Sequence, residues 1–222
     1  SPSGGDIEIA PEYLALADSQ DGIESRRELW VWYGSRLLMD EQAREQYRKL
    51  DAEGKLRRES FYNESVDRML SGEEQNMAGF FYGYSEELLR NLEVLEGTLD
   101  VEKFLTGDYI LLTQLYSKEF LPAAEHAYHP GDKVTVESIT EDTIFHEETN
   151  ENGEITGVVY ENLASKEYEV MAIVNIPYSM NLHRYAANGC DAVLPISEFG
   201  VTNELFAVSY QVADEYQKDF EA

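Results

Sequence analysis

Hydrophobic positions along the chain gather in short runs, and the spacing within most of these runs predicts strands. Tyr109–Thr113 is a continuous apolar run, which is typical of a strand covered on both faces. Lys133–Glu137 instead alternates polar and apolar residues after the turn Pro130–Asp132, so one face of that strand is expected to contact water. Further strands are predicted at Tyr168–Val174 and Asp191–Pro195.

The first sixty residues change from strand-like to helix-like patterns. Asp6–Ala10 alternates polar and apolar residues and predicts a short strand. Arg27–Leu38 is rich in aromatic and β-branched residues and favours a second strand, with a helix as the alternative. Asp40–Glu53 is rich in helix formers, with acidic residues in the opening turn and basic residues near the end, which predicts a helix. Gly54 is expected to end that helix.

A second helix, a strand and a short capped helix are predicted next. The helix covers Phe61–Leu70, and the strand covers Met77–Tyr84. Ser85 is a good N-cap residue, and acidic residues follow it, where the positive end of a helix dipole favours them. We therefore expect a short helix from Ser85 through Leu92.

The second half of the chain carries a hairpin signal and a mixed signal near its end. Asn152-Gly153 lies between the strand-like runs Thr143–His146 and Ile155–Tyr160, which indicates a β-hairpin. Leu205–Tyr210 predicts a strand that runs into a helix beginning at Val212. The helix is inferred from apolar residues four apart on one stripe: Val212, Tyr216 and Phe220.

These elements predict an α+β fold. We expect a mixed α/β part formed by both ends of the chain, residues 1–130 and 175–222, with a helical insert at about residues 40–70. Residues 131–174 are expected to form a β-rich insertion between the two halves.

Charge and cysteine content exclude several classes of protein. The chain has 222 residues, 43% of them hydrophobic, and a formal net charge of −27. Such a charge repels phosphate backbones and anionic lipid headgroups, so nucleic-acid binding and adsorption to an anionic membrane surface are not expected. Cationic peptides and metal ions are the partners it would attract. Cys190 is the single cysteine, which excludes a disulfide-stapled module.

No stretch of the sequence is expected to cross a bilayer. The longest run without a charged residue, Val170–His183, is too short and too polar. The opening residues Ser1–Gly5 include no initiator Met and no apolar signal core, so we expect the chain to be part of a larger protein.

The histidines offer two candidate zinc motifs, and neither is complete. His126 and His129 form an H-x-x-H pair, but Pro130 disfavours helical geometry at His129 and no third ligand can be identified. We interpret them as surface-loop histidines. His146-Glu147 begins like the zinc-protease helix motif, but position 150 is Asn where the second His is required.

Two further segments resemble a calcium loop and a nucleophile elbow, and each lacks one required residue. Glu148–Gly153 places oxygen ligands at alternate positions and Gly in sixth place, but Val159 occupies the twelfth position, where a bidentate Glu is needed. We do not expect calcium to bind through this loop, although the acidic surface as a whole is expected to bind divalent ions weakly and unspecifically. Gly83-Tyr84-Ser85 resembles the start of a nucleophile elbow, but Glu87 occupies the position of the second Gly.

The remaining candidates are a thiol and a set of aromatic residues. Cys190 with His183 could form a nucleophile and its base, although a small, half-buried lone cysteine is the commoner case. Aromatic residues could line a groove, but on strands they more often pack in the core. These aromatic residues are Trp30, Trp32, Tyr33, Phe80, Phe81, Tyr82 and Tyr84. No catalytic, cofactor-binding or metal-binding residue is assigned, and no cofactor is expected.

An ordered set of segments, covering more than a hundred residues from Tyr82 onward, resembles one known family. The set resembles the extracytoplasmic core domain of MacB-like and FtsX-like ABC transporter permeases. The matching segments are Tyr82–Leu89, Leu95–Gly97, Gly107–Leu112, Pro130–Val136, Tyr168–Val174 and Asp191–Pro195.

The resemblance implies a location, a partner and an absence of catalysis. It implies a porter-like α/β subdomain with a β-rich insertion, on the extracytoplasmic face of a bacterial cell membrane and between two transmembrane helices of a permease. ATP would be bound by a separate cytoplasmic subunit, and the outer domain would act mechanically on a peptide, a lipoprotein or a protein partner. The segment near Asp6 and the helix from Val212 would then lie close together and face the membrane.

Two other functions remain open. A stand-alone acidic cell-surface module could bind cationic peptides through its acidic face. A hydrolase could assemble a site from dispersed carboxylates, which would require a deep pocket holding two convergent acids of raised pKa.

Overall fold

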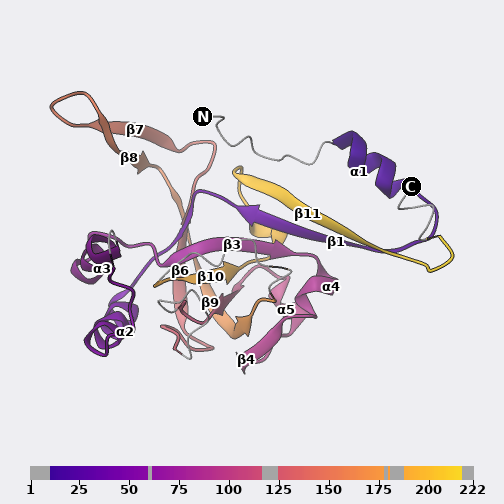
Figure 1. Ribbon diagram of the computed structural model, residues 1–222, viewed down its shortest axis with the longest axis horizontal. Coiled ribbons are helices and arrows are strands. Elements are labelled where there is room, and N and C mark those ends of the chain that lie inside the picture. Colours follow the sequence, from indigo (N-terminus) through magenta and orange to yellow (C-terminus); the bar gives the residue numbers. More distant parts are fainter. Residues whose placement is uncertain (1–10, 60–61, 117–124, 178–179, 181–187, 217–222) are drawn as a thin grey trace.

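The α+β fold expected from the sequence is the fold of the chain in a computed structural model (Figure 1). The structure describes residues 11–59, 62–116, 125–177, 180 and 188–216. The helices are α1 (Pro11–Asp18), α2 (Glu41–Ala52), α3 (Tyr62–Ser71), α4 (Glu86–Leu89), α5 (Val101–Phe104) and the 3₁₀ turn η2 (Ile196–Glu198). The strands are β1 (Ile23–Trp32), β2 (Ser35–Leu37), β3 (Ala78–Tyr84), β4 (Glu93–Gly97), β5 (Tyr109–Thr113), β6 (Lys133–Ser138), β7 (Ile144–Thr149), β8 (Ile155–Glu161), β9 (Ala164–Asn175), β10 (Cys190–Val193) and β11 (Asn203–Val212).

Nine of the strands in the described residues form one mixed sheet. Its order is β11-β1-β3-β10-β5-β9-β6-β2, and β4 pairs with β9 beside this path. β3–β10 and β5–β9 are parallel pairs, and the other pairs in the sheet are antiparallel. The sheet curls so that β2, its last strand, comes close to β3. The amide of Met77, just before β3, donates to the carbonyl oxygen of Leu37 in β2 at 3.0 Å.

β5 lies at the centre of the hydrophobic core and is covered on both faces, as its continuous apolar run predicts. Ile110 and Leu112 pack into one cluster of buried residues, whereas Leu111 packs into another on the opposite face. Helices α2 and α3 cover the first cluster, and α4 and α5 cover the second. The side chains of Trp32, Phe81, Tyr82 and Tyr84 are buried in these clusters, so the core interpretation is confirmed for these four aromatic residues.

The predicted helices α2 and α3 are confirmed and pack together. Asp40 caps α2 by accepting a hydrogen bond from the Ala43 amide at 2.8 Å, which satisfies one of the free N–H groups of the first turn. The buried guanidinium of Arg44 donates to the carbonyl oxygens of Met69 on α3 and of Met39, which joins the two helices. None of the described helices has the length and apolar content needed to cross a membrane.

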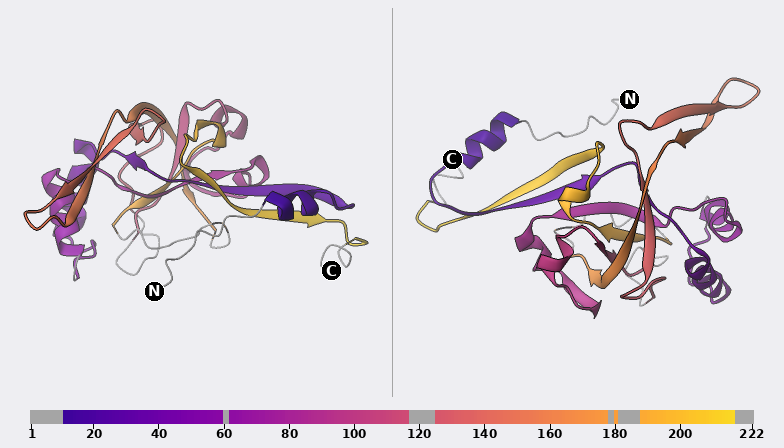
Figure 2. Two further views of the ribbon diagram at one scale, coloured as in Figure 1. Left: turned by 90° about the horizontal axis from the view of Figure 1, so that it is seen from above. Right: turned by 180° about the vertical axis from the view of Figure 1, so that it is seen from behind.

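The hairpin predicted around Asn152-Gly153 is confirmed as β7–β8, a separate two-stranded sheet. Its connection spans residues 150–154, and the Asn150 side chain accepts hydrogen bonds from the amides of Asn152 and Glu154, both at 3.0 Å. The hairpin projects from the main sheet in all three views (Figures 1 and 2). Its side chains are almost all exposed, and Phe145 retains 68% of its accessible surface.

β1 and β11 form a long antiparallel ribbon. It extends from the molecule on the side opposite the β7–β8 hairpin (Figure 2). Only Leu29–Val31 of β1 also pair with β3. At the far end of the ribbon, Ile23 lies opposite Val212, and the amide of Ala213 donates to the Gly22 carbonyl oxygen at 2.9 Å. α1 is tied to the same ribbon by a 2.7 Å hydrogen bond from the Tyr210 hydroxyl to Asp18.

Three of the predictions for local structure are corrected by the fold. The strand expected at Arg27–Leu38 is two strands, because the chain turns at Gly34 (φ +68°) and β2 joins the other edge of the sheet. The helix expected from Ser85 through Leu92 ends at Leu89, and the Ser85 hydroxyl accepts from the Glu28 amide at 3.1 Å instead of capping the helix.

The third correction concerns the helix expected from Val212. Val212 is the last residue of β11, and its pairing with Ile23 replaces a helical start there. Phe220 and the strand expected at Asp6–Ala10 lie outside the described residues. The division into residues 1–130, 131–174 and 175–222 stays a prediction, because strands of all three parts share one sheet and a shared sheet does not show which parts move separately.

Candidate functional site

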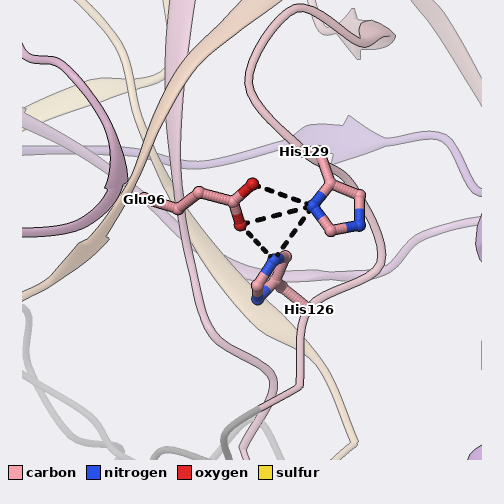
Figure 3. A group of neighbouring side chains, drawn as sticks. All are labelled: Glu96, His126 and His129. Atoms are coloured by element: carbon pink, nitrogen blue, oxygen red, sulfur yellow. Dashed lines mark hydrogen bonds and ion pairs between the residues drawn. The ribbon is translucent and has the colours of Figure 1, made fainter.

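Two histidines and one glutamate meet where β4 lies beside the loop that precedes β6 (Figure 3). His126 Nε2 lies 2.6 Å from Glu96 Oε2, and His129 Nδ1 lies 3.0 Å from Glu96 Oε1. The same two ring nitrogens are 3.3 Å from one another. Within the described residues, this is the group of His, Cys, Asp and Glu side chains whose ligand atoms lie close enough together to hold one metal ion.

The two residues between the histidines are buried, and this anchors the loop that carries the two imidazoles. Ala127 and Tyr128 are buried in the core cluster beneath α2. The Tyr128 hydroxyl lies 3.4 Å from the carbonyl oxygen of Leu38, which anchors the loop to the segment before α2. His126 and His129 flank this buried pair, and Figure 3 shows both rings turned toward the Glu96 carboxylate.

A tight turn after His129 fixes the backbone of this residue. The Asp132 side chain accepts from the His129 amide at 2.8 Å, while the Asp132 amide donates to the His129 carbonyl oxygen at 3.0 Å. The amide of Gly131, at the centre of the turn, donates to Val170 of β9 at 2.8 Å. The loop is therefore hydrogen-bonded to the main sheet beside the histidines, without a helix at His129.

Gly97 brings Glu96 close to this turn. Its backbone has a φ of +85°, and a Cβ atom there would lie 2.8 Å from Pro130 Cγ and 2.6 Å from the Met171 carbonyl oxygen. Only glycine combines this conformation with such a close approach. A register shift between Val94 and Glu96 in the β4–β9 pairing precedes the glycine, and Glu96 faces the histidine loop.

The three side chains differ in exposure and in their hydrogen bonding. The side chain of His126 is 19% exposed, that of Glu96 is 40% exposed and that of His129 is 62% exposed. The hydrogen bond from His129 is the main cause that lowers the pKa of Glu96 from its ordinary value, so this carboxylate is ionised at neutral pH. The second ring nitrogen of His126, Nδ1, is buried and has no hydrogen-bond partner among the described residues.

An open groove of about 480 Å³ lies next to the histidines. Both histidines line it together with one face of α2, and its other lining residues are Gln42, Glu45, Gln46, Lys49, Glu125 and Ala127. Glu125 is paired with Lys55, and Gln42 donates to Asp132 at 2.8 Å. The groove gives the imidazole pair access to solvent and to small ligands.

The other motifs that imitate a site do not assemble one. His146 lies on strand β7 rather than on a helix. Among the described residues, it forms an ion pair with Glu161 alone, at 3.8 Å. The calcium-like segment from Glu148 forms the end of the hairpin, and Asn150 uses its side-chain oxygen to close the connection. Ser85 uses its hydroxyl to join α4 to β1.

Cys190 is a core residue of β10. Its thiol is buried and lies 3.8 Å from the Met77 carbonyl oxygen. Burial, followed by the negative charge of Asp191, raises the pKa of this thiol far above its ordinary value, so it remains protonated and unreactive at neutral pH. His183, the base considered for it, lies outside the described residues.

Glu96 is the residue that the sequence did not identify. It lies where a third ligand of the H-x-x-H pair would have to lie, but the chain has 44 acidic residues and α5 and β5 separate Glu96 from the histidines, so no spacing singles it out. The turn that orients His129 gave a usable signal, because Pro130-Gly131-Asp132 is a turn sequence.

Comparisons with known proteins give a distant likeness to a solved structure. No family model and no curated protein sequence matches the chain. A solved structure, the periplasmic region of MacB from Actinobacillus actinomycetemcomitans, is similar over 93% of this chain and 68% of that chain, with 13% identity and a TM-score of 0.40. At this identity and score the similarity of fold is distant, and no residue role is transferred from it.

Proposed function

We propose that this chain is a non-catalytic extracytoplasmic domain of an ABC transporter permease of the FtsX- and MacB-like kind. In this proposal, membrane-embedded segments of the parent protein transmit ATP hydrolysis by a cytoplasmic subunit to the domain. The domain then acts on a peptide, a lipoprotein or a protein partner outside the bacterial cell membrane. Residues 131–174 are proposed to move as an inserted lobe relative to the porter-like part.

The observation that carries the proposal is the pairing of the first and last described strands, β1 and β11. Gly22 and Ala213 are joined by a backbone hydrogen bond at the far end of the β1–β11 ribbon. A domain inserted between two membrane-spanning helices needs both of its connections on one side. The ribbon meets this requirement, and its antiparallel pairing, which runs from Ile23 to Trp32 with two register shifts, can transmit a displacement to the main sheet.

The segments that carry the family resemblance occupy one continuous region of the structure. They form β3 with α4, then β4, β5, β6, β9 and β10, all of whose strands belong to the main sheet. The proposal includes no nucleic-acid partner, because a net charge of −27 repels the phosphate backbone of a nucleic acid.

Fractionation of cells that produce the natural protein tests the proposal. An antibody raised against this chain should detect the protein in the membrane fraction, and detergent-solubilised protein should copurify with an ATP-binding subunit whose ATPase activity it modulates. Recovery in the soluble or secreted fraction, without such a subunit, would contradict the proposal and favour the stand-alone acidic module.

A further inference from the structure

We infer that Glu96, His126 and His129 form a binding site for one divalent transition-metal ion of the Zn²⁺ class. This inference does not depend on the proposed transporter function. It rests on the arrangement of three ligand atoms that come from two separate segments, β4 and the loop before β6.

The separations between the ligand atoms match those around a small tetrahedral ion. Zn²⁺ binds imidazole nitrogen at about 2.0–2.1 Å and carboxylate oxygen at about 2.0–2.2 Å, so two ligands of one ion lie roughly 3.3 Å apart. The two ring nitrogens are 3.3 Å apart, and the Glu96 oxygens lie 2.6 to 3.3 Å from them. Small rotations of the carboxylate would bring all three ligands to bonding distance of one ion.

The donor set selects the class of metal. Two imidazoles and one carboxylate suit Zn²⁺ and neighbouring transition metals, whereas Ca²⁺ and Mg²⁺ prefer oxygen ligands in larger number. The acidic surface, with its charge of −27, raises the local concentration of any cation, but it does not by itself distinguish one divalent ion from another. Selectivity must therefore come from His126 and His129.

The site is held in place before a metal binds. The turn at Pro130 and Gly131 fixes the His129 backbone, burial of Ala127 and Tyr128 fixes the segment between the histidines, and the close contact at Gly97 fixes Glu96. A bound ion would take the place of the hydrogen-bonding protons between the rings and the carboxylate. Little backbone movement is required, so little ordering entropy is lost on binding.

Two features limit the affinity and leave part of the ion accessible. A hydrogen-bond partner on the second ring nitrogen orients an imidazole that binds a metal, and losing it typically weakens metal binding about 10–100-fold. His126 Nδ1 has no such partner among the described residues. Three protein ligands also leave a fourth position, which a water molecule or a small ligand in the adjoining groove would occupy. We therefore expect binding weaker than that of a closed four-ligand structural site.

Titration of the purified chain with Zn²⁺ tests the inference. The titration is made by competition with a chromophoric chelator, in about 150 mM salt and with excess Mg²⁺, so that the acidic surface is screened and its unspecific sites are filled. The chain should bind one equivalent of Zn²⁺ in preference to Mg²⁺. Glu96→Gln, His126→Gln and His129→Gln should each weaken binding at least tenfold.

His146→Gln is the matched control, because His146 also faces a glutamate, Glu161, but has no third ligand among the described residues. This variant should bind Zn²⁺ as the unaltered chain does. Each variant should first be shown to melt at the temperature of the unaltered chain without metal, and Zn²⁺ should raise the melting temperature only where the three ligands remain.

Cobalt gives an independent spectroscopic readout. Co²⁺ bound to this site should give the intense visible absorption of a low-coordinate ion, and His129→Gln should abolish it. Equal Zn²⁺ affinity of all three ligand variants and the unaltered chain, or a weak octahedral Co²⁺ spectrum, would overturn the inference and show only unspecific binding by surface carboxylates.

Discussion

The amide of Ala213 donates to the carbonyl oxygen of Gly22 at 2.9 Å, and this contact joins the outer ends of β1 and β11. Beyond it, β1 and β11 run side by side to the main sheet. The inner end of β1 lies between β11 and β3, whereas the outer end has β11 as its partner among the described strands.

This difference predicts two levels of protection in hydrogen exchange. The amides of Leu29–Val31 should exchange slowly, because β1 is flanked there by two strands and is buried at Leu29 and Val31. The amides of Ser25–Arg27 should exchange faster, since a two-stranded ribbon opens at a lower free energy. Exchange measured by NMR or mass spectrometry checks this, and uniform protection along β1 would contradict it.

The second prediction compares two glycines that share a positive φ. Gly97→Ala should lower the free energy of unfolding by about 2–4 kcal/mol, because a Cβ adds a clash with Met171 and Pro130 to the backbone strain. Gly153→Ala, at a position with no neighbour within 4 Å, should cost only the strain, about 1 kcal/mol. Urea unfolding gives both values, and equal costs would show that the close contact is absent.

A third prediction concerns stability at alkaline pH. Burial raises the pKa of Cys190 in the folded chain, so above the ordinary thiol pKa of about 8.5 the unfolded chain loses this proton while the folded chain keeps it. The contribution of the thiol is thus complete below that pH and is lost as pH rises through the interval up to the folded pKa. The slope is about 1.4 kcal/mol per pH unit for one proton.

Cys190→Ala provides the comparison for this pH dependence. The variant loses some stability at every pH through the lost packing, but its free energy of unfolding should fall less steeply than that of the unaltered chain between about pH 8.5 and 10. The measurement is urea unfolding at several pH values. Parallel curves for the two proteins would show that the thiol is not buried as described.

The fourth prediction is that the β7–β8 hairpin contributes little to the stability of the main sheet. Phe145→Ala should change the free energy of unfolding by less than about 0.5 kcal/mol, because the ring is exposed. Ile173→Ala on β9, fully buried in the core, should cost about 2–5 kcal/mol. A large loss of stability for Phe145→Ala would show that the hairpin packs against another part of the chain.

Sequence patterns predicted the elements that depend on neighbouring residues. The hairpin at Asn152-Gly153, the helix over Asp40–Glu53 and the doubly covered strand Tyr109–Thr113 follow from local turn chemistry, helix propensity and hydrophobicity, and the structure confirms them. The class of fold follows from the same patterns.

Elements that depend on distant partners were not predicted or were predicted wrongly. The spacing of Val212 and Tyr216 suits a helix, but pairing of Val212 with Ile23 across the whole chain determines a strand. β4 was missed because it is short and mostly exposed, and its pairing with β9 is what defines it. Glu96 was missed for the same reason, since only that pairing brings it to the histidines.

The measurement that tests the account most directly is the labelling of an exposed cysteine in intact cells. Phe145→Cys, placed in the natural protein, puts a thiol at a position that is 68% exposed, whereas Cys190 is buried. If the domain lies outside the cell, a membrane-impermeant maleimide should label the variant more strongly than the unsubstituted protein, and this added labelling should be equal before and after lysis. Labelling that requires lysis would place the domain inside the cell and contradict its role as the outer domain of a permease.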